Sequence, residues 1–386
     1  MKTAVVTATR AEYGILQPLI RKLHQDSGVE LQLLVTGTHL SEKYGNTQRE
    51  IEQDGFPVFA RFPILMQGNA PADISRIMAR ALEQFAGYFE RETPDCVVVL
   101  GDRTEMLGVC AAAMNAGVPI AHLHGGELTE GAVDDCVRHS ITKMAYLHFP
   151  STEVYRKRII QMGEAPERVF NVGALSVENI LHVPLLDRDE IEREAGIPAG
   201  TPYAVVTFHP VTRENGRERE QVKQLIAAME RSSGYFYLIT KANADAGGDT
   251  VNALLEDFTS RSANAGLVAS LGMRRYLSAV RHASFVLGNS SSGIVEAPCL
   301  GTPTVNIGDR QKGRLMADSI VNCLPETDDI LQAMALAAGM EHRPSFLYGD
   351  GETSGKIVDI LKKTFGDGRP DLKKAFYDIS FEGESV

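Results

Sequence analysis

Short apolar runs alternate with longer amphipathic stretches along the whole chain. Runs that are apolar at every position are typical of strands buried on both faces of a parallel sheet. We therefore expect strands at residues 3–7, 31–35, 96–100, 118–122, 147–149 and 169–172, and then at 204–208, 235–239, 267–268, 285–287 and 304–307. Helices are expected between them, at 15–25, 74–91, 104–116, 152–162, 219–231 and 273–282. Strands that alternate with helices in this way predict βαβ units.

The alternation restarts near the middle of the chain, around residues 171–174 and the charged segment 187–194. A chain of 386 residues is also longer than one hydrophobic core usually supports. We expect an α/β protein with two Rossmann-like domains whose parallel sheets face each other across a cleft. The N-terminal domain is expected at residues 1–170 and the C-terminal domain at 171–365. A tail or helix at 366–386 is expected to pack back on the N-terminal domain.

Composition narrows the class of protein. Apolar residues make up 44% of the chain and charged residues 23%, as in ordinary soluble proteins. The formal net charge of -11 argues against a nucleic-acid partner, because no net basic field attracts phosphates. The five cysteines form no CxxC pair, and no early apolar run has the length of a signal peptide or a membrane span. We therefore expect a cytoplasmic protein without a membrane partner.

Polar residues recur where the expected strands end. In open α/β sheets the carboxyl ends of the strands line the ligand crevice. The polar groups are residues 9–14, 36–39, 102–103 and 124–127 in the first half, and 209–212, 241–245, 288–293 and 309–311 in the second half. Solvated loop charges are the alternative interpretation. Charges scattered over a surface would not gather at almost every strand end, so the pattern favours a ligand site.

Residues 101–139 hold the densest set of ionisable side chains. Carboxylates, two arginines and imidazoles near one sheet edge indicate acid/base chemistry on an anionic ligand. In the second half, residues 288–293 lead from a strand into a helix start that begins with Ser290 and Ser291. Exposed N–H groups and hydroxyls at such a place bind anions, although N-capping by serine explains this segment equally well.

Further side chains fit a nucleoside diphosphate held mainly by the second domain. Arginines offer forked donors to a diphosphate, and the candidates are Arg10, Arg103 and Arg310. Glu296 follows one turn into the helix and suits a ribose diol. His209 lies between a strand and Pro210, so it could donate to a phosphate or transfer a proton.

No motif indicates a cofactor. No GxGxxG follows a strand, which argues against a dinucleotide site. Residues 349–356 are similar to a phosphate-binding loop, but Asp350 and Ile357 stand where that motif needs Gly and Ser or Thr. The histidines at 122, 124, 139 and 148 lack the spacing of a metal site. We therefore expect neither a metal nor an organic cofactor.

Taken in order, these residues resemble the hydrolysing UDP-N-acetylglucosamine 2-epimerases of bacterial sialic-acid synthesis. The resemblance spans nearly the whole chain. It rests on Thr9-Arg10-Ala11-Glu12-Tyr13-Gly14, Gly101-Asp102-Arg103, His124-Gly125-Gly126-Glu127, Asp134-Asp135, Arg138-His139-Ser140-Ile141-Thr142-Lys143, His209-Pro210, Asn243-Ala244-Asp245, Gly288-Asn289-Ser290-Ser291-Ser292-Gly293 with Glu296, Gly308-Asp309-Arg310-Gln311, Gln311-Lys312-Gly313-Arg314 and Phe376-Tyr377-Asp378-Ile379.

The resemblance implies a GT-B fold with UDP on the second domain, the sugar over the first, and a homodimer or homotetramer. It implies UDP contacts from Arg10, Arg103, His209, Asn243, Ser290, Ser291, Glu296 and Arg310. It implies a catalytic set on the sugar side consisting of Asp102, Glu127, Asp134, Asp135, Arg138 and His139, together with His209. Some relatives read His-Ile-Glu-Gly-Gly-Glu where this chain has His122-Leu123-His124-Gly125-Gly126-Glu127. That departure leaves the base open between Glu127 and Asp102.

The activity implied is conversion of UDP-N-acetylglucosamine and water to N-acetylmannosamine and UDP, through a 2-acetamidoglucal. Asp134, Asp135 or His139 would serve the second face of the sugar. Four alternatives stay open at this stage. They are a hydrolysing epimerase of UDP-2,4-diacetamido-2,4,6-trideoxyglucose, a non-hydrolysing epimerase, a UDP-sugar sensor without activity, and a GT-B glycosyltransferase.

Overall fold

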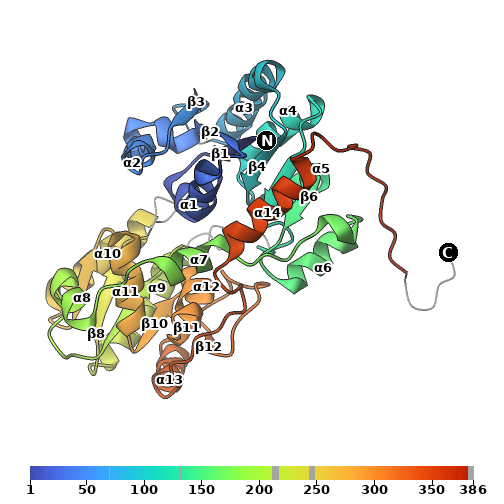
Figure 1. Ribbon diagram of the computed structural model, residues 1–386. Helices are drawn as coiled ribbons and strands as arrows, with labels where there is room; N and C mark the ends of the chain where they lie inside the picture. Colours follow the sequence, from blue (N-terminus) through green and yellow to red (C-terminus); the bar gives the residue numbers. More distant parts are fainter. Residues whose placement is uncertain (69, 130–132, 211–216, 243–247, 381–386) are drawn as a thin grey trace. The chain divides into compact units, whose positions relative to one another are not determined.

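The computed structural model describes residues 1–68, 70–129, 133–210, 217–242 and 248–380 (Figure 1). The chain divides into two compact units. Unit 1 comprises Met1–Leu128, Ala132–Asn179 and Tyr348–Val386, and unit 2 consists chiefly of Ile180–Leu347. In the described part of the chain, no helix combines the length and the apolar character needed to cross a membrane.

Unit 1 is built on a six-stranded parallel sheet with strand order β3-β2-β1-β4-β5-β6. Its strands are β1 (Lys2–Thr7), β2 (Glu30–Thr36), β3 (Val58–Phe62), β4 (Cys96–Leu100), β5 (Ile120–Leu123) and β6 (Leu147–Phe149). Its helices are α1 (Arg10–Gln25), α2 (Gln48–Gln53), α3 (Pro71–Glu92), α4 (Thr104–Asn115), α5 (Val133–Met144), α6 (Glu153–Gln161), α7 (Leu175–His182, which ends in unit 2) and α14 (Thr353–Phe365). Short 3₁₀ turns lie at Gly37–Leu40, Glu42–Tyr44 and Pro166–Arg168.

Unit 2 repeats this architecture with strand order β12-β11-β10-β7-β8-β9, again all parallel. The strands are β7 (Tyr203–Thr207), β8 (Phe236–Thr240), β9 (Ala265–Val268), β10 (Phe285–Gly288), β11 (Thr304–Ile307) and β12 (Ile320–Cys323). The helices are α8 (Arg188–Ala195), α9 (Glu218–Arg231), α10 (Gly248–Arg261), α11 (Gly272–His282), α12 (Ser292–Cys299) and α13 (Thr327–Ala338).

Each face of the unit 1 sheet carries its own apolar core. Successive side chains of a strand point to opposite faces, and in β1 Val5 belongs to one cluster while Ala4 and Val6 belong to the other. The central strands are therefore apolar at almost every position, which is why the sequence pattern predicts them. The expected strands at 3–7, 31–35, 96–100 and 204–208 all coincide with strands of the structure.

The structure differs from the sequence pattern at a few elements. The expected strand at 169–172 contributes only a single bridge, between His148 and Val169. The sequence pattern misses β3 and β12, and both are edge strands. Their residues are mostly half-buried or exposed, so they lack the continuous apolar run that marks a central strand.

The expected domain border at residue 365 also differs from the division found. The chain returns to unit 1 at Tyr348, and α14 packs there beside α1 (Figure 1). Its apolar face, with Ile357, Leu361 and Phe365, belongs to the unit 1 core. Beyond it, residues 369–380 form neither helix nor strand. In this tail the Arg369 guanidinium donates to the carbonyl oxygen of Pro94, and the Tyr377 amide to that of Gly163.

Candidate active site

The carboxyl ends of β4 and β5 present the acidic residues of unit 1. Gly101, with a positive φ of 71°, turns the chain after β4 so that Asp102 and Arg103 follow at the start of α4. After β5 the chain turns through Gly126 before it reaches Glu127. Gly126 has a φ of 78°, and a Cβ there would lie 2.5 Å from the carbonyl oxygen of Tyr155. Only glycine fits this close approach, so the turn that delivers Glu127 depends on it.

Arg138 connects three segments of the site. Its side chain is almost completely buried, and α5 projects it under the two strand ends. One terminal nitrogen donates to the carbonyl oxygen of Glu127 at 2.9 Å and to Asp135 Oδ1 at 3.2 Å. The other donates to Asp102 Oδ2. A buried guanidinium with its forked donors in use holds its partners in fixed positions, so Asp102, Glu127 and Asp135 form one cluster.

The Glu127 carboxylate is fixed from a different direction. It is 9% exposed and accepts a hydrogen bond from the Ser151 hydroxyl at 3.1 Å on Oε1. His124 Nδ1 lies 3.5 Å from the same oxygen. The arrangement suits a group that takes up or gives away a proton.

Beneath the cluster, His122 supports the strand ends. Its Nε2 lies 2.8 Å from the carbonyl oxygen of Gly101, so this nitrogen carries the proton and donates. Nδ1 lies 3.2 Å from the Thr142 hydroxyl, which also donates to the carbonyl oxygen of Arg138 at 3.0 Å. Burial lowers the pKa of His122 to about 3, against the opposing effect of the bond to Gly101. The ring is therefore neutral at neutral pH, and it positions the turn that holds Asp102.

The remaining residues predicted for the sugar side lie on α5. Asp134 is exposed in the first turn of the helix. It is close enough to Arg103 for its carboxylate to contribute to the raised pKa of that guanidinium. His139 is half-buried, and burial lowers its pKa, against the opposing effect of Asp135. Asp102, Glu127, Asp135 and Arg138 are thus joined by direct contacts or by the shared guanidinium, whereas Asp134 lies at the margin.

A carboxylic acid that the sequence analysis did not single out lies beside Arg103. Glu12 is buried at the start of α1 and accepts hydrogen bonds from the backbone N–H groups of Ala8 and Thr9, at 2.9 and 3.1 Å. Burial raises its pKa to about 7, although the nearby Arg103 opposes the shift. Arg103 Nε donates to Glu105 Oε1 at 2.7 Å. Arg10, the first residue of α1, is exposed. The spacing Thr9-x-x-Glu12, a capping box, was the available signal.

In unit 2 the ends of β7 and β10 are joined by a reciprocal pair of hydrogen bonds. The Asn289 side chain accepts from the His209 amide at 2.7 Å and donates to the His209 carbonyl oxygen at 2.8 Å. Arg310 and Gln311 both donate to the carbonyl oxygen of Asn289, at 3.0 and 2.9 Å. His209, Asn289 and Arg310 are therefore held together. Asn289 and Gln311 organise this group, a role that only the tertiary contacts reveal.

Glu296 and Tyr276 bury polar atoms close to Ser292. Among the described residues, neither Glu296 Oε2 nor the Tyr276 hydroxyl makes a hydrogen bond of good geometry, although Ser292 lies near both and Thr207 near the hydroxyl. Burial raises the pKa of both groups, with Glu296 also raising that of Tyr276. Unpaired buried polar atoms are costly, and a ligand hydroxyl is one way to satisfy them.

The serine segment follows the N-capping alternative at Ser290 but not at Ser291. Ser291 precedes α12 with helical backbone angles, and its side chain makes no capping hydrogen bond. Ser290 accepts from the Ser292 amide at 3.3 Å and is half-buried. Asn243, the remaining residue predicted for the nucleotide, lies outside the described residues.

Comparison with known proteins decides the family. The sequence pattern described as UDP-N-acetylglucosamine 2-epimerase matches residues 21–362. The chain belongs to the UDP-N-acetylglucosamine 2-epimerase family. It is 39% identical over 333 residues to the GDP/UDP-N,N'-diacetylbacillosamine 2-epimerase (hydrolyzing) of Campylobacter jejuni, with 86% of each chain covered. It is 37% identical over 384 residues to the polysialic acid biosynthesis protein P7 of Escherichia coli, with 98% of this chain and 97% of the relative covered.

A third relative is also named as a hydrolysing 2-epimerase. The UDP-N,N'-diacetylbacillosamine 2-epimerase (hydrolyzing) of Legionella pneumophila is 33% identical over 362 residues, with 94% of this chain and 95% of the relative covered. Together with the family match, these relatives place the chain with the hydrolysing 2-epimerases, as the sequence resemblance predicts.

Solved structures show the same fold. The UDP-GlcNAc 2-epimerase of Neisseria meningitidis, solved with UDP-GlcNAc, aligns with a TM-score of 0.82 at 17% identity and covers 94% of this chain and 100% of that chain. The Methanocaldococcus jannaschii enzyme, in complex with UDP-GlcNAc and UDP, aligns with a TM-score of 0.78 at 18% identity, with the same coverage. The predicted α/β, GT-B-like fold class with two Rossmann-like units is therefore confirmed.

Proposed function

We propose that this enzyme hydrolyses a UDP-linked 2-acetamido sugar and inverts its C2, and that UDP-N-acetylglucosamine is the first candidate substrate. N-acetylmannosamine and UDP would be the products. The observation that supports this most is the cluster around Arg138, which fixes Asp102, Asp135 and the backbone of Glu127 at two strand ends. Inversion of a carbon by proton exchange requires proton-transfer groups on both of its faces. A cluster with several carboxylates meets that requirement.

Unit 2 supports the nucleotide part of the proposal. Glu296 Oε2 and the Tyr276 hydroxyl, which make no hydrogen bond of good geometry among the described residues, suit the two hydroxyls of a ribose. Arg310, His209 and the start of α12 with Ser290 and Ser291 offer donors to a diphosphate. These contacts, like those proposed for Arg10, Arg103 and Asn243, come from the resemblance and the local chemistry of each residue.

The proposed reaction starts with the departure of UDP. The C2 proton is barely acidic because no carbonyl is attached to that carbon. Cleavage of the C1–O bond leaves an oxocarbenium-like centre at C1, and donors around the diphosphate stabilise the charge on the leaving group. A carboxylate, Glu127 or Asp102, then takes the C2 proton, and the C–H electron pair forms the double bond of a 2-acetamidoglucal.

Hydration completes the proposed reaction. An acid on the ring face opposite the base gives a proton to C2, the hydroxyl of a water adds to C1, and the water's remaining proton goes to the carboxylate or imidazole that the acid has become. Asp134, Asp135 or His139 is the proposed acid. Of these, Asp135 is held by Arg138 within the cluster, and the lowered pKa of His139 keeps its ring mostly neutral at neutral pH. The result is the manno configuration and a free sugar.

Substitution of Glu127 by Gln tests the assignment of the base. The amide oxygen of Gln can still accept from Ser151, but it cannot take a proton. We expect turnover to fall roughly a hundredfold to ten-thousandfold, with UDP affinity unchanged. Glu153→Gln is the matched control, because Glu153 is exposed on α6 and pairs only with Arg156 among the described residues. Retained turnover in Glu127→Gln would shift the assignment to Asp102.

Loss of the acid on the second face of the sugar ring should give a different product pattern from loss of the base. In Asp135→Asn the first half of the reaction is intact, so UDP release should continue while the glycal accumulates. Product analysis by NMR during turnover measures this directly. A variant that releases neither UDP nor glycal would mean that Asp135 acts in the elimination or supports the fold around Arg138.

A second candidate substrate is UDP-2,4-diacetamido-2,4,6-trideoxyglucose, since the Campylobacter and Legionella relatives carry names for enzymes of that sugar, diacetylbacillosamine. Incubation with each UDP-sugar in deuterated water, followed by NMR, separates the candidates. A free sugar with deuterium at C2 supports hydrolytic epimerisation of whichever substrate yields it. A UDP-linked epimer would indicate a non-hydrolysing enzyme, and binding without turnover would contradict the proposal.

A further inference from the structure

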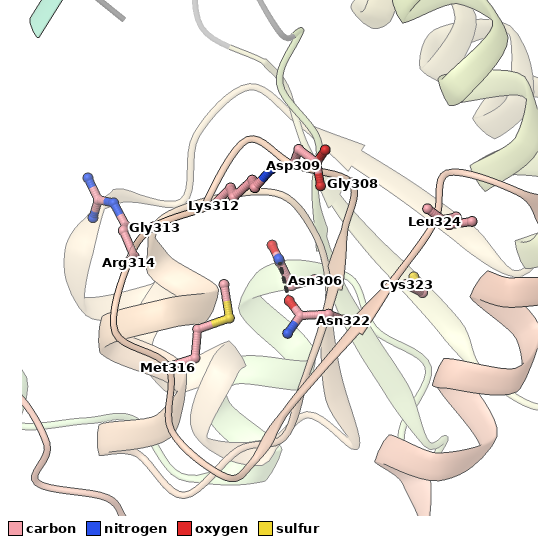
Figure 2. A pocket seen from close by; sticks show the side chains of 10 residues that line it. All are labelled: Asn306, Gly308, Asp309, Lys312, Gly313, Arg314, Met316, Asn322, Cys323 and Leu324. Carbon is pink, nitrogen blue, oxygen red and sulfur yellow. Dashed lines mark hydrogen bonds between the residues drawn. The ribbon is translucent and has the colours of Figure 1, made fainter. Parts of the chain in front are cut away.

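Unit 2 has a cavity of about 500 Å³ that the proposed reaction does not use (Figure 2). It lies at the carboxyl ends of β11 and β12, at the β12 edge of the sheet, whereas His209 and Ser290 of the proposed nucleotide contacts follow β7 and β10. Arg310, another of these contacts, belongs to the segment after β11 but does not line the cavity. Residues 308–316, the segment after β11, contribute most of its wall. Small-molecule sites typically enclose roughly 300–1,000 Å³, so the cavity is large enough for a sugar-sized ligand.

Three charged side chains line the wall. Within the described part of the chain, Lys312, Arg314 and Asp309 make no direct ion pair and no side-chain hydrogen bond, and the nearest recorded charge partner is the buried Glu296, whose raised pKa Arg314 opposes. Elsewhere in unit 2, exposed cations such as Arg231 and Lys241 have a carboxylate within 2.7 Å. Two cations and one carboxylate give this wall a net positive charge, in a protein whose overall charge is -11. The wall therefore favours an anion.

The floor of the cavity adds polar and apolar contacts. Asn306 Nδ2 donates to Asn322 Oδ1 at 2.8 Å, which fixes both amides in the centre of the cavity (Figure 2). Among the described residues, the other polar atoms of these two amides have no hydrogen-bond partner. A free amide oxygen and a free amide NH₂ recognise hydroxyl groups. Met316 and Leu324 flank them with apolar surface.

The wall is also tied to the proposed nucleotide contacts. Arg310 and Gln311, from the same segment as Lys312, donate to the carbonyl oxygen of Asn289. Asn289 in turn holds the backbone of His209. A ligand that draws Lys312 and Arg314 together would bias the position of this segment, and thereby the residues on its other side.

We propose that this cavity is a second binding site, for a small hydroxylated anion such as a sugar phosphate or a sugar carboxylate. Lys312 and Arg314 would bind the anionic group, and the Asn306–Asn322 pair the hydroxyls. Binding itself does not depend on the proposed function. An effect of the bound anion on UDP affinity, transmitted through Asn289, does rest on it.

Direct binding measurements test the proposal. The full-length protein, saturated with UDP to occupy the nucleotide site, is titrated calorimetrically with glucose 6-phosphate, glucuronate and uncharged glucose. We expect at least one of the two anions to bind and glucose not to bind, and the stronger anion distinguishes phosphate from carboxylate. Lys312→Met retains the apolar stem without the charge, and should weaken binding about tenfold or more, as the loss of a charge-assisted hydrogen bond does. Arg314→Met should act similarly.

Lys223→Met serves as the matched control, because Lys223 is an exposed lysine of unit 2 that does not line the cavity. Equal binding of glucose and the anions, or equal affinities in Lys312→Met and Lys223→Met, would overturn the second site. Anion binding that occurs only when UDP is left out would also overturn it, since the cavity would then be part of the nucleotide site. A protein that binds the anion but turns over no UDP-sugar would contradict the proposed function alone.

Discussion

At the scale of single residues, Glu12 is a carboxylic acid whose ionisation departs clearly from its ordinary behaviour. Burial raises its pKa from 4.5 to about 7, because water no longer stabilises the carboxylate and the two backbone donors and Arg103 compensate only in part. The folded protein therefore holds this proton between about pH 4.5 and 7, where the unfolded chain has lost it. Its contribution to stability is present below about pH 4.5 and is lost as the pH rises through 7.

The Glu12→Gln variant tests the direction of this pH dependence of stability. Gln keeps an acceptor for the amides of Ala8 and Thr9 but cannot ionise, so the fall in Tm between about pH 5 and pH 8 should be smaller than in the unmodified protein. Thermal unfolding at a series of pH values measures it. Glu50→Gln, at an exposed position of α2, should leave the pH profile unchanged. Identical profiles for all three proteins would mean that Glu12 ionises normally in the fold.

At the scale of elements, the sequence predicts the strands that are buried on both faces of a sheet, because burial makes every position of such a strand apolar. Strands such as β4 and β7 are apolar at every position, so their existence and their ends can be read from the chain, and with them the neighbourhood of Asp102 and His209. Edge strands β3 and β12 cannot, because one side of each is partly solvated. The role of Arg138 is also hidden, since its partners come from strand ends that only the tertiary fold brings to α5.

His122 joins two of these elements, the end of β4 and helix α5, and its burial has a consequence at low pH. The pKa of this imidazole is about 3 in the fold and 6.5 when exposed, so unfolding takes up a proton between those values. Stability should therefore fall as the pH drops from about 6.5 towards 3. In His122→Gln the slope of unfolding free energy against pH should decrease by about 1.4 kcal/mol per pH unit around pH 5, the contribution of one proton.

Denaturant unfolding at several pH values gives this slope. His39, whose pKa burial lowers to about 4, acts in the same direction and keeps part of the slope in the variant. The variant should be less stable at neutral pH, because Gln packs and hydrogen-bonds differently below Gly101. The slope is therefore the readout, and an unchanged slope would contradict the neutral state assigned to His122.

At the scale of the whole molecule, the end of the chain closes onto unit 1 around a single buried carboxylate. Glu164 has no exposed surface and lies 2.5 Å from Lys374, 2.6 Å from Lys143 and 3.1 Å from His148 Nε2. Burial alone would raise its pKa, but the hydrogen bonds from His148 and the two lysines outweigh that and lower it to about 2. The tail is thus held by an ion pair that water barely screens.

Two further contacts make Lys374 the centre of this attachment. Its Nζ also donates to the carbonyl oxygens of Lys143 and Ala145, and two residues later the Phe376 ring covers Gly163 beside the ammonium group of Lys143. Gly163 has a φ of 88° and a Cβ there would overlap the ring. The local chain is therefore shaped to receive the tail.

Lys374→Met should release residues 369–380 from unit 1 while the rest of the fold persists, because Lys143 and His148 still satisfy Glu164. Hydrogen exchange in that segment should become faster, and the segment should become sensitive to limited proteolysis. Lys373→Met is the matched control, since the neighbouring Lys373 is exposed and its side chain makes no hydrogen bond or ion pair among the described residues. The pKa of Glu164 is lowered to about 2, so its contribution to the stability of the fold is present above about pH 4.5 and is lost as the pH falls towards 2. In the unmodified protein, protection of the tail from hydrogen exchange should be lost over the same pH range. Equal hydrogen exchange of the tail in both lysine variants would show that the ion pair does not hold the tail.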